Sequence, residues 1–323
     1  MLSSLDKTFL CLIGLFLASN SFGQELYILN EPASSVPKGV IGVRAFNQTY
    51  KEYSTVRSLN ALRVMYGATP KLSLMATASI SNHHNRKLPA DLINHVHVGN
   101  QTNYYTQAIK RGVRYPQLFN GIHLFAKYRF FTRDEQFKHL RIAAYGEWSN
   151  VNVAHDEAEP NLLDDTGGYG FGLISTWLKN RFAMSLTTGI IKPGSYFEYQ
   201  RDVTGGPDLP TTIHYGDAVK YNLSFGYRLH PKTYENYRQV NWNLYLELIG
   251  KSYGAATVIQ NRTDIEAKTG ALQRGAYVEI YPGIQRIINS NTRIEFCYGF
   301  SLIGYSYVHF TPLWTFAIQH YFY

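Results

Sequence analysis

From residue 40 to the end of the 323-residue chain, apolar and polar residues alternate with a period of two. In 220–230, tyrosine, leucine and phenylalanine fill every odd position, while polar residues and one glycine fill the even positions. Residues 241–251 and 292–302 repeat the pattern. Successive side chains of a strand point to opposite faces, so each segment predicts a strand with one apolar and one polar face. The sequence therefore predicts an all-β fold.

Twelve segments of the chain follow this pattern. They are residues 40–53, 58–69, 71–84, 118–133, 138–154, 169–180, 181–195, 217–231, 240–254, 276–289, 292–307 and 311–323. Tight turns near 69–71, 134–136, 180–181 and 290–291, with a somewhat longer one at 231–239, alternate with long loops at 85–117, 155–168, 196–216 and 255–275. Short periplasmic turns that alternate with long extracellular loops are typical of outer-membrane β-barrels.

A sheet with an apolar outer face has to close on itself in lipid, because no water is present to satisfy the hydrogen bonds of an open edge. We therefore expect a closed antiparallel transmembrane β-barrel of about 12 strands over residues 40–323, located in the bacterial outer membrane and in contact with its lipid. Aromatic residues at 128–131 and 305–310 are consistent with interfacial girdles. The alternative is a secreted soluble all-β protein, but such folds rarely sort their connections so regularly.

The first residues of the chain have the features of a targeting segment. An apolar run at 9–18 is followed by small residues that suit cleavage after Gly23, so residues 1–23 are predicted to be a signal peptide. Cleavage removes one of the 2 cysteines and leaves Cys297, so the mature chain has no internal disulfide. Residues 24–39 then form a short N-terminal periplasmic segment, which we expect to be too short for a folded plug or a docking domain.

The last segment of the chain resembles the C-terminal assembly signal of bacterial outer-membrane proteins, a strand of alternating apolar residues that ends in an aromatic residue. Its residues of one parity are Trp314, Phe316, Ile318 and Phe322. His320 stands where an aromatic or apolar residue is usual, and Tyr323 lies one position beyond the usual end. The chain is similar to outer-membrane barrels of Bacteroidota type and, more loosely, to transporters ascribed to the phenol-degradation pathway. The resemblance implies insertion by the outer-membrane assembly machinery.

Charged residues of the polar parity are predicted to line the lumen. They are Arg44, Arg63, Lys127, Arg129, Arg141, Glu147, Lys220, Arg228, Glu247, Lys251, Glu279, Arg293 and Glu295. Nine of them are cations and four are carboxylates, so this wall carries net positive charge. Twelve strands make a backbone cylinder roughly 24 Å across, which long side chains narrow.

Two functions fit this lumen. One is a narrow passive channel for small solutes, with anions favoured by the excess of arginine and lysine. The other is a closed structural or surface-binding barrel, in which arginine and glutamate pair across the lumen and fill it while the extracellular loops contact a partner.

Other functions are not supported by the sequence. A lipid-hydrolysing barrel needs serine and histidine on its lipid-facing side, where only His320 is available, so we predict no enzyme activity. The pairs His83-His84 and His95-x-His97 are a weak metal signal, and we predict neither a metal site nor a cofactor. The net charge of +8 is not gathered into runs, so we expect no nucleic-acid partner.

Overall fold

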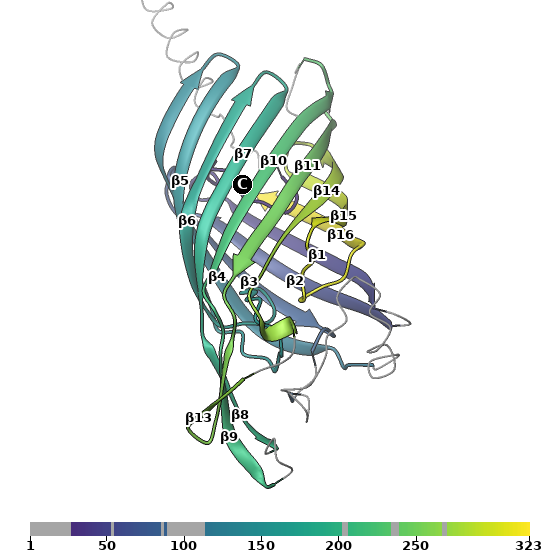
Figure 1. The fold of residues 1–323 in the computed structure, drawn as a ribbon. Helices are drawn as coiled ribbons and strands as arrows, with labels where there is room; N and C mark the ends of the chain where they lie inside the picture. The colour runs from purple at the N-terminus through teal and green to yellow at the C-terminus, as the bar shows by residue number, and fades with distance from the viewer. Residues whose placement is uncertain are drawn as a thin grey trace, which may run out of the picture.

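The computed structural model describes residues 27–52, 55–84, 87–88, 114–201, 206–233, 239–266 and 270–323 (Figure 1). The predicted signal peptide, residues 1–23, and the pair His95 and His97 lie outside these ranges. Within the described ranges, no helix is long and apolar enough to cross a bilayer.

Twelve antiparallel strands close into a barrel. They are β1 (Ile41–Glu52), β2 (Thr55–Gly67), β3 (Leu72–Ser81), β4 (Leu118–Glu135), β5 (Lys138–Ser149), β6 (Gly168–Lys179), β7 (Phe182–Pro193), β10 (Ala218–His230), β11 (Asn241–Tyr253), β14 (Gly275–Ile288), β15 (Thr292–Ile303) and β16 (Leu313–Phe322). The first and last strands pair with each other, with Ile41 opposite Phe322, and this pairing closes the sheet. Each of the twelve predicted segments forms one of these strands, so the predicted fold class is confirmed.

The observed strands end earlier than predicted at two places where the chain after the strand folds into the lumen of the barrel. The segments expected at 138–154 and 292–307 end as strands at Ser149 and Ile303. After Ile303, Gly304 has a φ of 62°, and a Cβ at this position would lie 2.4 Å from the carbonyl oxygen of Ala276. Only glycine tolerates both constraints, so the strand stops there.

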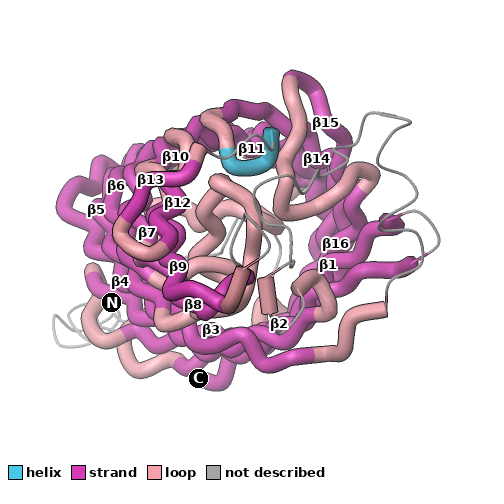
Figure 2. Tube along the Cα trace, turned by 60° about the horizontal axis from the view of Figure 1, so that its bottom comes forward, coloured by secondary structure: helices cyan, strands magenta, loops and turns pink. Residues whose placement is uncertain are grey.

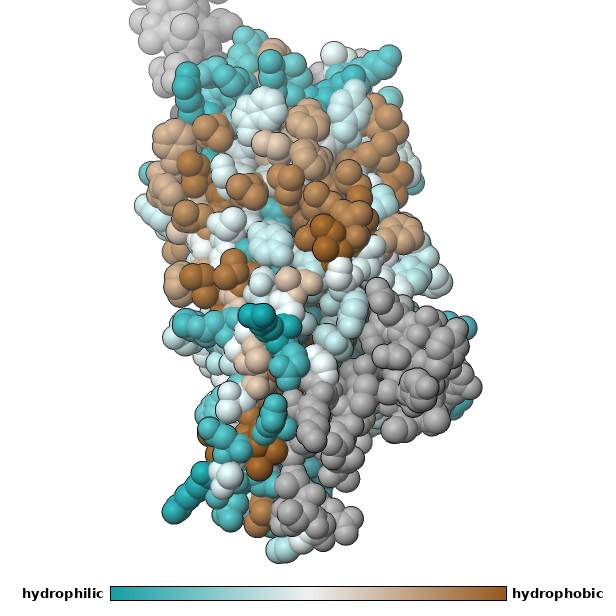
Figure 3. All heavy atoms as spheres, in the orientation of Figure 1, coloured by the Kyte–Doolittle hydropathy of each residue, from teal (hydrophilic) through white to brown (hydrophobic). Residues whose placement is uncertain are grey.

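The outer face of the barrel is apolar over the height of the strands. Figure 3 shows a brown band of hydrophobic residues around the strands, with hydrophilic residues beyond it. Half-exposed large side chains make up this band, among them Leu62, Leu124, Leu186 and Phe296. This is the surface that an outer-membrane barrel presents to lipid.

The residues of the assembly signal also lie on this outer face. Trp314, Phe316, Ile318 and Phe322 of β16 are all about half exposed. His320 shares their face, and its Nδ1 lies 2.8 Å from the hydroxyl of Thr292 on the neighbouring strand.

One of the two expected aromatic girdles has a different position. Tyr128, Phe130 and Phe131 are exposed near a short turn, as a girdle requires. Tyr305, Tyr307 and Phe310 instead belong to the connection between β15 and β16, and Phe310 stacks on Tyr50 at a ring distance of 5.9 Å. Because Tyr50 is buried, the second group packs within the molecule and does not form a lipid-facing belt.

Two of the long connections contain strands of their own. β8 (Ser195–Arg201), β9 (Asp208–His214), β12 (Thr257–Gln260) and β13 (Thr263–Ile265) form a second, four-stranded sheet that projects beyond the barrel at the bottom of Figure 1. Ile213 lies opposite Val258, and both are buried with Leu272 of the short helix η1 (Gly270–Leu272). The sequence predicts long loops at 196–216 and 255–275 and gives no sign of this sheet, because its few apolar residues are spread over two segments that are distant in sequence.

Candidate functional site

The lumen of the barrel is lined by ion pairs. Arg44 of β1 and Glu295 of β15 are 2.7 Å apart, and Lys220 of β10 and Glu147 of β5 are 2.5 Å apart. All thirteen residues expected to line the lumen alternate with lipid-facing residues on their strands. The most deeply buried, at no more than 1% exposure, are Lys127, Glu247, Glu279, Arg293 and Glu295.

The chain ahead of the first strand enters this lumen. The carboxylate of Glu247 accepts backbone hydrogen bonds from Ile28 at 2.9 Å, from Leu29 at 2.9 Å and from Asn30 at 3.0 Å. The side-chain amide of Asn30 donates to the same carboxylate at 3.0 Å. One buried acid thus satisfies four donors of an extended segment that has no secondary structure of its own.

Further contacts fasten the same segment to other strands. Glu31 lies 2.9 Å from Arg63 and 3.3 Å from Lys127, and Lys127 donates to the carbonyl of Pro32 at 2.6 Å. Ser34 accepts a hydrogen bond from Arg141 at 3.1 Å. Arg44 also binds the segment and donates to the carbonyl of Ile28 at 2.6 Å. Five of the residues predicted to line the lumen therefore bind this segment, namely Arg44, Arg63, Lys127, Arg141 and Glu247.

The end of the segment adds an apolar anchor. Tyr27 and Ile28 are each 1% exposed, and the ring of Tyr27 meets that of Tyr245 edge to face at 5.9 Å. A Cβ on Gly283 would lie 2.6 Å from the Cδ1 of Ile28, so glycine leaves the space that Ile28 fills.

These contacts correct the expected position of residues 24–39. We expected a segment in the periplasm, too short to form a folded plug, but the described part of it, from residue 27, lies inside the barrel. A plug does not need to fold on its own here, because the side chains of the wall satisfy its backbone.

A second segment, the connection 150–167 between β5 and β6, fills the other half of the lumen. Its Glu159 accepts from Lys251 at 2.8 Å, from Tyr277 at 2.8 Å and from Ser306 at 2.8 Å. Burial alone would raise the pKa of Glu159, but the charges of Lys251 and His309 and the hydrogen bonds from Lys251 and Ser306 together outweigh burial and hold this pKa below its usual range. Figure 2, an oblique view into the barrel, shows such loop segments inside the ring of strands.

The two inserted segments change the charge balance of the lumen. The wall was expected to carry nine cations and four carboxylates. The inserted segments add six carboxylates, namely Glu31, Asp156, Glu157, Glu159, Asp164 and Asp165. Cations and carboxylates are then present in nearly equal number, so a net positive lumen does not follow from the wall alone.

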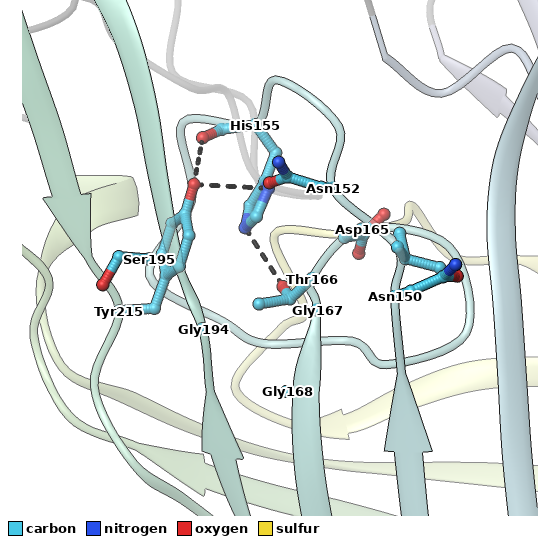
Figure 4. A pocket seen from close by; sticks show the side chains of 11 residues that line it. Asn150, Asn152, His155, Asp165, Thr166, Gly167, Gly168, Gly194, Ser195 and Tyr215 are labelled. Carbon is cyan, nitrogen blue, oxygen red and sulfur yellow. Dashed lines mark hydrogen bonds between the residues drawn. The ribbon is translucent and has the colours of Figure 1, made fainter.

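A small pocket of about 200 Å³ lies at the end of β6 and β7, beside the connection 150–167 (Figure 4). The ring of His155 stacks on that of Tyr215 at 4.2 Å, and the Tyr215 hydroxyl donates to the backbone carbonyl of His155 at 3.0 Å. Burial lowers the pKa of His155 to about 3, so its imidazole is neutral at pH 7. Asp165 lines the same pocket.

Behind this pocket, Asp164 and Asp165 meet the two histidines that follow β3. The Oδ1 of Asp165 contacts the Nε2 of His84, and the Nδ1 of His83 lies 2.9 Å from the Oδ2 of Asp164. The histidine pair can be recognised in the sequence but its two aspartate partners cannot, because nothing in the chain order indicates that segments 80 residues apart meet inside a barrel.

Comparison with known proteins bears on the fold. No protein-family model matches the sequence, and no curated protein matches it. The structure is similar to the COG4313 outer membrane channel from Pseudomonas putida F1, with 11% identity, a TM-score of 0.56 and coverage of 92% of this chain and 100% of the other. The fold is that of a bacterial outer-membrane β-barrel. Together with the apolar outer band, the closed barrel locates the protein in the outer membrane.

Two other solved outer-membrane barrels are less similar to this chain. The NanC porin has 8% identity over 86% of this chain and 97% of its own, with a TM-score of 0.42. The β-domain of the Bordetella autotransporter BrkA has 12% identity over 88% of this chain and 98% of its own, with a TM-score of 0.41. At these identities the comparisons describe architecture and assign no residue a role.

Proposed function

We propose that this protein is a narrow passive channel for small polar solutes, in which residues 27–38 and the connection 150–167 constrict the lumen. The observation that carries the proposal is the chemistry of the contact between these segments and the wall. Hydrogen bonds and ion pairs dominate it, as at Glu247, Glu31 and Glu159. Groups of this kind are readily solvated by water when a segment moves aside.

The comparison with solved structures supports this reading at the level of architecture. The outer membrane channel of Pseudomonas putida F1 has the same fold, and that protein is described as a channel. A polar lumen inside a closed barrel is the usual arrangement in porins. A relation to transporters of the phenol-degradation pathway stays a proposal based on the C-terminal strands. We assign no catalytic role to any residue.

We further propose that anion preference, if the channel has one, is set near the periplasmic turns. Arg129, Arg228 and Arg293 all lie close to short turns. The carboxylates of the inserted connection lie nearer the long loops. A solute that crosses the barrel would then meet acidic groups toward the extracellular side and guanidinium groups toward the periplasm.

The test is conductance of the mature protein refolded in a planar bilayer under a salt gradient, with folding confirmed by heat-dependent mobility on a gel. We expect small openings from wild type, larger openings after deletion of residues 27–36, and a shift toward cation selectivity in the double variant R129E/R228E. Silence from wild type and from the deletion variant, when both are folded and inserted, would contradict the channel.

The second candidate is a closed barrel that binds a partner outside the cell. It is favoured by Phe197 and Tyr199, which are 56% and 62% exposed on β8 of the projecting sheet. Their rings meet at 5.6 Å, so an aromatic pair is held in a fixed arrangement without apolar cover. Silent but folded barrels, with substitution of this pair abolishing adhesion of cells to a surface, would favour this function.

A further inference from the structure

Two histidines and two aspartates meet at the extracellular end of the lumen. His83 and His84 directly follow β3, and Asp164 and Asp165 belong to the inserted connection 150–167. One ligand atom from each of the four side chains can be chosen so that all four lie within 4.8 Å of one another. Imidazole nitrogen and carboxylate oxygen are the ligands that Zn²⁺ and similar ions use most when cysteine is absent.

The four side chains are almost completely removed from solvent. The exposed fraction of the side chain is 5% for His83, 7% for His84, 1% for Asp164 and 0% for Asp165. Among the described residues, the Nε2 of His83 and the Oδ2 of Asp165 have no hydrogen-bond partner. Buried polar atoms are normally paired, so these two atoms are available to bind a ligand in the cluster.

Neighbouring groups orient the aspartates. The side-chain amide of Asn161 donates to the Oδ1 of Asp164 at 2.8 Å and leaves its Oδ2 facing His83. The backbone amides of Asp165 and Thr166 both donate to the carbonyl of Asn161, at 3.1 Å and 2.9 Å. A hydrogen-bonded outer shell of this kind is characteristic of metal sites, where it fixes the orientation of each ligand.

We propose that His83, His84, Asp164 and Asp165 bind one divalent transition-metal ion, with Zn²⁺ as the best match to two nitrogen and two oxygen ligands. Ligand atoms about 2.0–2.1 Å from Zn²⁺ at tetrahedral angles lie about 3.4 Å apart. The separations of up to 4.8 Å in the structure need only side-chain adjustment to reach that geometry. An ion at the centre could take the Nε2 of His83 or the Oδ2 of Asp165 as its ligand from that side chain, which would give this atom a partner.

Such an ion would join two separate parts of the chain. The histidines are attached to the barrel wall through β3, whereas the aspartates are on the inserted connection. At present the hydroxyl of Ser79 on β3 donates to the carbonyl of Leu163 at 2.7 Å, which holds the same two parts together. The pocket in Figure 4 reaches Asp165 and offers a path by which the ion is exchanged. The site therefore clamps the connection 150–167 in the lumen, whether or not the lumen conducts.

The experiment is titration of the refolded mature protein with Zn²⁺ alone by calorimetry, followed by Co²⁺ substitution and visible spectroscopy. We expect one ion per chain and Co²⁺ bands of tetrahedral intensity. The double variant H83Q/D164N should bind at least 100-fold more weakly, since it removes one ligand from each part of the chain. If that variant does not fold, the single variant H84Q, read by the Co²⁺ spectrum, takes its place.

Two control variants test whether the effect is local. H139Q/D134N removes an exposed histidine–aspartate contact of 2.9 Å at the opposite end of the barrel, and it should bind like wild type. H95Q/H97Q removes the histidine pair that comes next in the sequence and should also bind like wild type. Absence of saturable Zn²⁺ binding by folded wild type, or undiminished binding by H83Q/D164N, would overturn the proposal.

Discussion

The replacement Glu247→Gln tests whether residues 27–38 are held in the lumen by this one carboxylate. Its Oε1 accepts the backbone amides of Ile28 and Leu29, and its Oε2 accepts the backbone and side-chain amides of Asn30. Glutamine keeps the size of the side chain but replaces one oxygen with an NH₂ group. In either orientation of the amide, that group faces two donors of the segment, so two hydrogen bonds to the segment are lost together with the negative charge. At the Oε2 position it also faces the hydroxyl of Ser224, which donates to the carboxylate at 3.1 Å.

The expected magnitude follows from the lost contacts. A hydrogen bond to a charged group contributes about 1.5–3 kcal/mol, and neighbouring bonds are not additive, so we expect a loss of about 3 kcal/mol. This loss corresponds to a roughly 100-fold shift of the equilibrium from the bound toward the released segment.

Two assays read this equilibrium independently. In single-channel recordings, E247Q should spend a larger fraction of time in a high-conductance state than wild type. In a background that carries Ser34→Cys, a soluble maleimide should label the segment about 100-fold faster when E247Q is also present, since Ser34 is buried in the lumen.

The matched control is Glu279→Gln. Glu279 is a buried carboxylate on the adjacent strand β14, but it contacts the side chains of His309 and Tyr281. Since these contacts, to His309 and Tyr281, lie outside residues 27–38, E279Q should label at the wild-type rate. Equal conductance and equal labelling in E247Q and wild type would refute the reasoning that Glu247 holds the segment.

Three further results are expected. Burial holds the pKa of His155 near 3, so below about pH 6.5 the unfolded connection binds a proton that the folded one does not, and the connection should lose stability as the pH falls from about 6.5 toward 3. Protease cleavage of the connection should become faster over this range. The variant H155F keeps the stack on Tyr215 and should make the cleavage rate less dependent on pH. K251M leaves the buried carboxylate of Glu159 without its cation at a cost of about 3–5 kcal/mol, so cleavage of the connection should accelerate, and E159Q/K251M should restore part of the resistance. Cys297 is 1% exposed, so a polar maleimide should label it in urea but not in the folded barrel, and equal rates would contradict its burial.

The barrel could be predicted from the sequence because its determinants are local. Alternation along each strand indicates which side chains face lipid, and the lengths of the connections indicate the order of the strands. The same local pattern placed Arg44 and Glu295 on the polar face, where they form an ion pair of 2.7 Å.

The contents of the lumen could not be predicted in this way. Residues 27–38 carry no periodic pattern, and the acceptors of their backbone amides lie about 220 residues away at Glu247. The meeting of His83 with Asp164 likewise depends on a connection that folds inward, for which the sequence has no short-range signal. The predicted excess of positive charge counted only residues on strands, so for the same reason it left out the carboxylates of the two inserted segments.

The contacts of residues 27–38 also decide how firmly this segment closes the barrel. Release exposes Tyr27 and Ile28, at about 1.5–3 kcal/mol each, and it also breaks the bonds of Glu247, Arg63 and Lys127, whose charged groups are then solvated by water. If cleavage follows Gly23, as the sequence predicts, the segment has one free end and no part of it belongs to the sheet. The connection 150–167 is tied to strands at both ends and to Lys251 by a buried ion pair. Of the two inserted elements, the N-terminal segment is therefore the one that can leave the lumen while the barrel stays folded, and mutations at Glu247 should change conductance more than mutations at Glu159.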